Sequence, residues 1–238
     1  MIKLTVQLTF QMKVARVRRV KKILNFYKNH FGLAPPYRIL VDGTLAYRAL
    51  KAKVNIAEDL PKYLCHAGSK QTSSATPSQT NDHHGESDQP PSTFSPFNCE
   101  ILTTSCCLKE LEDLGPPGHG ALCVLRQYTI KPCGHTEPIP PVHCLLSILK
   151  GGKLGRQLRR WSVADSQLRV NGRLFSTGNP GKFILASMHD ELKLKAQNIA
   201  QVPILYLNGP APVLDKPSER AVQLAERSTK NATKEDKV

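Results

Sequence analysis

Acidic side chains follow three apolar runs of the sequence, where a sheet could bring them together. Asp42 ends the run 38–41, Glu110 lies in the helix expected after the run 100–103, and Asp190 follows the run 183–186. Ligands and metals gather at the carboxyl ends of strands in open α/β sheets. Carboxylates there can hold Mg²⁺ or Mn²⁺ against a phosphodiester, the chemistry of a metal-dependent nuclease. An ordinary Asp-Gly turn is the alternative for Asp42, and surface ion pairing is the alternative for Glu110.

Thiol and imidazole groups form a second cluster in the sequence. Cys133, His135 and Cys144 are joined by a Pro-rich connector, and both ligand types suit zinc. A fourth ligand is needed, for which Cys123 on the preceding helix is the best candidate and His143 the next. A buried cysteine without a metal is the alternative for Cys123.

The other cysteines give no sign of a disulfide scaffold. Seven cysteines, an odd number, in a basic chain of 238 residues favour reduced thiols or a metal site. We interpret the adjacent Cys106 and Cys107 as small apolar residues packed on a helix.

The charge of the chain indicates a partner that carries phosphates. Lys and Arg number 33 against 19 Asp and Glu, which gives a net charge of +14, and no acidic residue precedes Asp42. Basic residues crowd the segment before it, which suits RNA binding or nuclear import: Arg16, Arg18, Arg19, Lys21, Lys22 and Lys28. The alternative is a solvated helix face.

Apolar runs alternate with helical patterns along the chain. We expect strands at 38–41, 100–103, 183–186 and 203–207, and helices at 44–51, 56–64, 105–114, 120–128, 143–149, 191–197 and 218–227. The alternation of apolar and polar residues at 2–10 predicts a further strand. This order indicates an α/β fold with a mainly parallel sheet flanked by helices. No run is apolar enough for a membrane span, and we expect a soluble intracellular protein without a membrane partner.

Two stretches interrupt this rhythm. Residues 67–98 are rich in Ser, Thr, Pro and Gln, and we expect them to be a disordered insertion. Residues 150–182 are rich in Arg and Gly; we interpret them as a basic, dispensable insertion, with an RNA-binding loop as the alternative.

Several segments resemble a known family. NFYKNHFG at 25–32, PYRILVDGT at 36–44, LPKYL at 60–64, LKELEDLG at 108–115, the Cys-x-His and Cys pair, and VLDKPS at 213–218 are similar to the PIN-domain proteins of the small-subunit processome. Within them, the chain most resembles the branch of U three protein twenty-three, which carries an inserted zinc knuckle. The resemblance runs from about residue 16 to about residue 218, interrupted by both insertions.

The resemblance implies a PIN-like, Rossmann-like domain at 36–215 with a zinc-knuckle segment at 123–144, a basic N-terminal segment at 1–35, and a C-terminal helix and tail at 216–238. It implies nucleolar residence in the nucleus, early 18S rRNA processing, and binding to pre-rRNA or a small nucleolar RNA beside processome proteins. The acids of the PIN metal site would map onto Asp42 and Glu110. The zinc ligands would map onto Cys133, His135 and Cys144.

The chain departs from the family pattern at its sites. The third PIN acid falls on His189, with Asp190 one residue late, and the first zinc cysteine falls on Tyr128. Both insertions are foreign to the family and would also fit mis-joined exons, which transcript sequencing across their edges would test. The prediction is a non-catalytic RNA-binding assembly factor with a zinc site. The alternative is a PIN endoribonuclease in which Asp42, Glu110 and Asp190 hold magnesium or manganese.

Overall fold

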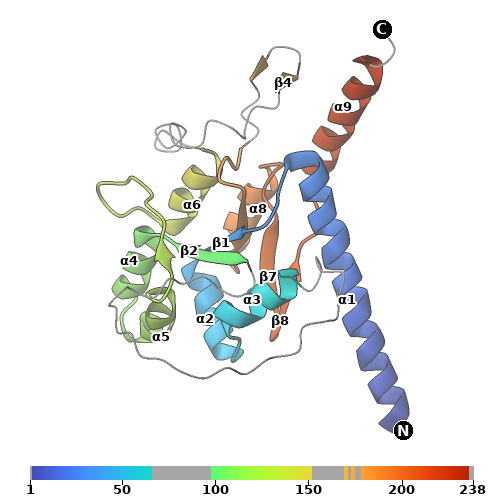
Figure 1. The fold of residues 1–238 in the computed structure, drawn as a ribbon. Coiled ribbons are helices and arrows are strands. Elements are labelled where there is room, and N and C mark those ends of the chain that lie inside the picture. The colour runs from blue at the N-terminus through green and yellow to red at the C-terminus, as the bar shows by residue number, and fades with distance from the viewer. Residues whose placement is uncertain (1, 66–97, 152–168, 171–172, 175–177, 236–238) are drawn as a thin grey trace, which may run out of the picture.

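The computed structural model describes residues 2–65, 98–151, 169–170, 173–174 and 178–235 (Figure 1). Side chains are described for 16–65, 98–151 and 178–230. Most of the two insertions expected at 67–98 and 150–182 lies outside the described residues. The described part of the second contains a short antiparallel pair, β4 (Arg169–Val170) and β5 (Arg173–Leu174).

The centre of the molecule is a six-stranded sheet in the order β3-β2-β1-β6-β7-β8. Its strands are β1 (Tyr37–Val41), β2 (Cys99–Thr103), β3 (Thr129–Ile130), β6 (Phe183–Ala186), β7 (Ile204–Asn208) and β8 (Ala211–Leu214). All pairs are parallel except β7 with β8. The expected mainly parallel sheet is confirmed, and the antiparallel β8 was not expected.

Helices flank this sheet. They are α2 (Gly43–Lys51), α3 (Ile56–Cys65), α4 (Ser105–Asp113), α5 (Pro116–Leu125), α6 (Pro141–Leu149), α8 (Asp190–Gln197) and α9 (Glu219–Glu235). The strands β1 and β6 lie at the centre of the core, where Ile39, Leu40 and Leu185 are fully buried. None of the described helices combines the length and the apolar character needed to cross a membrane.

The N-terminal segment is one long helix, α1 (Ile2–Phe31), so the strand predicted at 2–10 is wrong. Residues 2–31 contain neither Gly nor Pro. Once the packed part of the helix is fixed by Val20, Leu24 and Tyr27, each further turn extends at little cost. Gly32 ends the helix with φ 66°, a conformation that glycine adopts freely. Figure 1 shows the other end of α1 pointing away from the sheet.

Parallel strands place their carboxyl ends at one edge of the sheet. The residues that follow β1, β2 and β6 are Asp42, Thr104 and Ser187, and all three are buried. Two of them begin helices: Asp42 caps α2, and Thr104 caps α4 as predicted, each by accepting a backbone N–H bond. These three polar residues therefore lie at the same edge of the sheet.

Candidate functional site

Asp42 is held by its own chain on both carboxylate oxygens. Oδ1 accepts from the backbone N–H of Leu45 at 2.8 Å, and the Thr44 hydroxyl donates to both oxygens at 2.9 and 2.8 Å. Oδ2 also accepts a short bond from the Ser187 hydroxyl at 2.5 Å. The side chain therefore accepts from donors in the first turn of α2 and in the loop after β6.

Both hydroxyls pass on hydrogen bonds from the backbone of the loop after β6. The N–H of Met188 donates to Thr44 Oγ1 at 3.1 Å, and the N–H of His189 donates to Ser187 Oγ at 3.0 Å. Each hydroxyl accepts from a backbone amide and donates to Asp42, so each needs an acceptor oxygen on Asp42. We call this arrangement of Asp42, Thr44 and Ser187 the carboxylate clasp. Neither Thr44 nor Ser187 was expected from the sequence as a site residue.

Glu110 lies close enough to Asp42 for the two charges to interact. Burial and the Asp42 charge both raise the pKa of Glu110. Burial also raises the pKa of Asp42, although its hydrogen bonds from Ser187, Leu45 and Thr44 and the nearby His189 act in the opposite direction. The structure thus brings two of the predicted acids together with the His at the third position.

Asp190 points away from this group. Its side chain is 89% exposed and forms an ion pair with Lys193 at 2.8 Å on the first turn of α8. His189 precedes it as the N-cap of α8, where its ring Nδ1 accepts from the backbone N–H of Leu192 at 3.4 Å. The carboxylate that follows β6 is therefore one residue too late to face Asp42.

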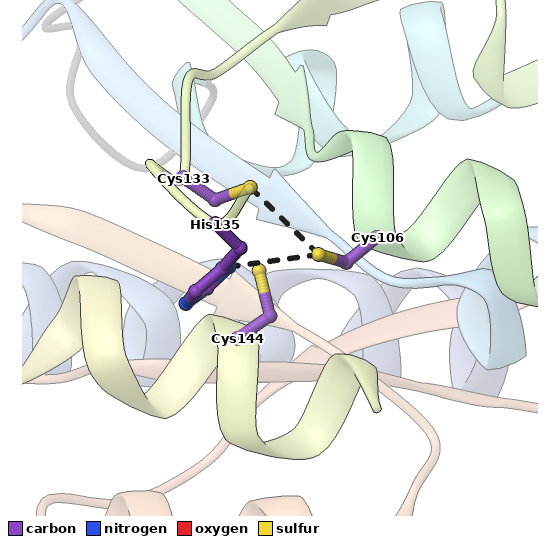
Figure 2. Close-up of side chains that lie close together, drawn as sticks. All are labelled: Cys106, Cys133, His135 and Cys144. Atoms are coloured by element: carbon purple, nitrogen blue, oxygen red, sulfur yellow. Dashed lines mark hydrogen bonds between the residues drawn. The ribbon is translucent and has the colours of Figure 1, made fainter. Parts of the chain in front are cut away.

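Four side chains converge in a second cluster, shown in Figure 2: Cys106, Cys133, His135 and Cys144. Cys106 comes from α4, Cys133 and His135 from the loop after β3, and Cys144 from α6. Their ligand atoms all lie within 4.8 Å of one another, and the three cysteines are buried. We call this the Cys/His cluster.

The spacing of these atoms fits a tetrahedral metal ion. The Sγ atoms of Cys106 and Cys133 are 3.8 Å apart, and Cys106 Sγ lies 3.6 Å from His135 Nδ1. Bond lengths of about 2.3 Å to sulfur and about 2.1 Å to nitrogen place tetrahedral ligands roughly 3.8 and 3.6 Å apart. Three thiols and one imidazole are also a common donor set for a structural zinc ion.

The thiols of the cluster differ in their acidity. Burial raises the pKa of Cys106 and of Cys144. Burial acts on Cys133 in the same direction, but bonds with Ser105, His135 and Cys106 outweigh it and lower its pKa to about 6. A thiolate beside an imidazole is ready to bind a cation, whose charge would favour loss of the other two protons.

The fourth member of the cluster is Cys106 rather than the predicted Cys123. Cys123 is exposed on α5, where its Sγ lies 3.5 Å from His119 Nε2, and His143 is exposed on α6. Tyr128 packs against the main core instead. The interpretation of Cys106 as a packed apolar residue is therefore corrected, whereas Cys107 does lie in the main core.

One signal in the sequence could have identified Cys106. The apolar stripe of α4 runs through Cys107, Leu108 and Leu111, and Cys106 lies outside it. A cysteine beside a stripe, at the start of a helix that follows a strand, needs another reason to be buried. The Cys/His cluster supplies that reason.

Helix α4 connects the two clusters. The Thr104 hydroxyl lies 3.6 Å from Cys144 Sγ in the Cys/His cluster and 3.2 Å from Cys107 Sγ. Burial raises the pKa of Cys107, and the charges of Asp42 and Glu110 add to this effect. Cys106 and Glu110 are one turn apart on the same helix. The carboxylate clasp and the Cys/His cluster are therefore neighbouring parts of one sheet edge.

The basic residues predicted to contact RNA all lie on α1. The side chains of Arg16, Arg18, Arg19, Lys21, Lys22 and Lys28 are exposed. Buried positions alternate with them at helical spacing, and Val20, Ile23 and Tyr27 anchor this part of α1 to the core. The exposed cations are thus presented on a helix that is fixed to the domain.

Comparison with known proteins gives a family. Residues 96–216, just over half of the chain, match the family model described as Fcf1. The chain belongs to the Fcf1 family. This PIN-like family acts in rRNA processing. The matched range contains Glu110, His189 and all four residues of the Cys/His cluster, whereas Asp42 and α1 precede it.

Among solved structures, this Fcf1-family chain is similar to one described as the structure of the PIN domain endonuclease Utp24. The two share 16% identity with a TM-score of 0.47, over 78% of this chain and 96% of that chain. A likeness of this degree says nothing about activity.

Proposed function

We propose that this Fcf1-family chain is a non-catalytic RNA-binding assembly factor of the small-subunit processome. It would act in the nucleolus in early 18S rRNA processing, beside other processome proteins, by binding pre-rRNA or a small nucleolar RNA. Within the family we assign it to the U three protein twenty-three branch, with a zinc ion in the Cys/His cluster.

The carboxylate clasp carries this proposal. A nuclease of this type needs carboxylate oxygens that are available to Mg²⁺ or Mn²⁺. Both oxygens of Asp42 already accept hydrogen bonds from Leu45, Thr44 and Ser187. A cation would have to displace these donors, and the third position holds His189 instead of a carboxylate.

Zinc would have a structural role in this proposal. Cys106, Cys133, His135 and Cys144 would occupy all four tetrahedral positions, which leaves no open position for a substrate or an activated water. The ion would fix the loop after β3 to α4 and α6, and hence hold one side of the sheet edge in place.

The exposed cations of α1 would supply most of the RNA affinity. Lys and Arg bind phosphates and release counterions, so the affinity falls steeply with salt. If all six side chains contact a single-stranded segment, the slope of log K against log salt is roughly −4. We expect neutralising three of them, by Arg18→Gln, Lys21→Gln and Lys22→Gln, to reduce that slope by about 2.

The test follows binding and cleavage of a structured pre-rRNA fragment in the same gels, with Mn²⁺ and the full chain. The proposal expects salt-sensitive retardation, weakened by the α1 triple variant and not by Lys109→Gln on α4 as a matched control. It expects no cleavage, with or without Asp42→Asn. Cleavage by the wild type that Asp42→Asn abolishes would instead identify an endoribonuclease.

His189→Asp sharpens this test, because it restores a carboxylate at the family's third acid position. Cleavage that appears in this variant and needs Mn²⁺ would show that the missing acid alone inactivates the site. Continued inactivity would assign the loss to the clasp as well, and Ser187→Ala combined with His189→Asp would then be the next variant.

A further inference from the structure

A second pair of thiols, Cys65 and Cys99, lies outside the Cys/His cluster. The Sγ atoms of Cys65 and Cys99 are 3.9 Å apart. Cys65 is the last residue of α3, and Cys99 is the first residue of β2. Cys65 is therefore the last described residue before 66–97, and Cys99 is the second described residue after them.

We propose that Cys65 and Cys99 are an oxidation site that forms an intramolecular disulfide. The two sulfurs must approach by about 2 Å to reach the length of a disulfide bond. Cys65 ends a helix and is half-buried, so a rotation of its side chain and a small adjustment of the helix end can supply the movement.

The partner cysteine is held more firmly. Cys99 is 5% exposed, and its position in β2 is paired with Tyr37 of β1. The N–H of Tyr37 also donates to the carbonyl oxygen of Asn98 at 3.1 Å, which fixes the start of β2 on the sheet. Cys99 is thus a fixed, buried thiol, and Cys65 is the more accessible one.

The surroundings of this pair distinguish it from the pair Cys106 and Cys133. Those two sulfurs are separated by nearly the same distance, 3.8 Å, but a third thiol and an imidazole complete a set of four metal ligands around them. Among the described residues, no such group includes Cys65 or Cys99. Two thiols whose sulfur atoms lie 3.9 Å apart are suited to oxidation.

The difference in accessibility sets the order of the reaction. A small disulfide such as glutathione disulfide is the oxidant. Cys65 loses its proton, its sulfur attacks one sulfur of the small disulfide, and a mixed disulfide forms as one small thiol leaves with a proton. Cys99 then loses its proton and attacks Cys65 Sγ, which releases the second small thiol. Two protein thiols are oxidised, and one small disulfide is reduced to two thiols.

Burial has two consequences for this pair. It raises the pKa of Cys65, and it raises that of Cys99 to about 12, so the thiolates that must attack are scarce near neutral pH and the reaction is slow. The fold also does not stabilise either thiolate, so it does not favour the reduced pair over the disulfide. Such a disulfide resists reduction once formed.

The test uses the full zinc-loaded chain and glutathione disulfide. Peptide mass mapping without reductant is expected to find a peptide that joins Cys65 to Cys99, lighter by two hydrogens than the sum of its parts. The cross-link closes a loop of about 35 residues, which predicts a rise in Tm of roughly 5–10 °C that reductant reverses.

Three variants serve as controls. Cys65→Ser and Cys99→Ala are expected to abolish both the joined peptide and the rise in Tm, whereas Cys123→Ser, at an exposed cysteine, leaves both unchanged. A joined peptide that involves other cysteines overturns the proposal, as does a glutathione adduct on Cys65 that never proceeds to the cross-link. The wild-type map decides between these outcomes even if Cys99→Ala does not fold.

Discussion

The carboxylate clasp and the Cys/His cluster lie at the same sheet edge and use their ligand atoms in different ways. The oxygens of Asp42 face donors from the chain itself, namely Leu45, Thr44 and Ser187. In the Cys/His cluster, three sulfurs and a ring nitrogen converge on one another, and the thiols of Cys106 and Cys144 would lose their protons on binding a metal. A carboxylate surrounded by donors can hold a structure together without a metal, whereas thiols and an imidazole that face one another could hold a cation between them.

This contrast gives a reason for keeping Asp42 in a chain that, as we propose, does not cleave RNA. The clasp connects the loop after β1 to the loop after β6, so Asp42 has a structural reason to stay even where no metal binds. The presence of an acid at this position is then weak evidence for catalysis. The hydrogen-bond donors around Asp42 are stronger evidence, and they favour a structural role for this side chain.

The largest effect is expected from removing a ligand of the Cys/His cluster. Cys106→Ser replaces a thiolate ligand with a hydroxyl, and we expect zinc affinity to fall by more than about 100-fold, beyond the loss typical of a residue that only orients a ligand. The protein should also unfold at a lower temperature. Zinc content after dialysis and thermal unfolding measure both effects.

Cys123→Ser is the matched control for Cys106→Ser. Both change one cysteine on neighbouring helices, but Cys123 is exposed and lies outside the cluster. If Cys123→Ser lost zinc and Cys106→Ser kept it, the assignment of the fourth ligand made from the structure would be wrong.

The sequence predicted the strands that position these sites better than the side chains that form them. Apolar runs gave the buried strands within one or two residues, because strands buried on both faces leave a continuous signal. Cys133, His135 and Cys144 are recognisable because they lie close together in the chain. Cys106 lies 27 residues before Cys133, and only the crossover through α4 and β3 brings it to them.

Hydroxyl groups were the least predictable part. Thr44 and Ser187 carry no charge and lie in the first turn of α2 and in the loop after β6, and their roles depend on how these two segments meet at the sheet edge. The helix at residues 2–10 was missed for a related reason. Local alternation predicted a strand there, while the packing of Val20 and Tyr27 further along fixes the whole segment as a helix.

The next effect in size is expected at the clasp. Asp42→Asn replaces one of the two carboxylate oxygens with an NH₂ group. This group is a donor, and it would face a hydroxyl that also donates toward this position. We expect a loss of about 1–3 kcal/mol in the free energy of unfolding. Denaturant unfolding measures it, with Asp113→Asn on α4 as a control that loses an exposed ion pair with Lys109. A gain in stability would mean that Asp42 is a strained metal ligand, as in an active site.

The same variant has a pH dependence with a definite sign. Burial raises the pKa of Asp42 above its ordinary value of 3.8, so the folded protein binds this proton more tightly than the unfolded chain. Its contribution to stability is fully present below the ordinary value and is lost as the pH rises through the raised pKa. Asn has no such titration, so the cost of Asp42→Asn should shrink as the pH rises from about 4. A cost that grows with pH would contradict the raised pKa.

The smallest effect is expected at Glu110, and its sign is opposite. The charge of Asp42 raises the pKa of Glu110, so Glu110→Gln relieves a repulsion between two carboxylates. Glu110 is exposed to solvent, which screens the interaction, and we expect a gain of no more than about 0.5 kcal/mol in the free energy of unfolding. Glu112→Gln, on the same helix as Glu110, is the control, and it breaks an exposed ion pair with Arg126 at the end of α5. The gain should disappear when Asp42→Asn is also present, because the repulsion needs both charges.

If Mn²⁺ stabilised the wild type and Glu110→Gln removed that stabilisation, the two carboxylates would be binding a cation together, and the clasp would not exclude a metal from this edge.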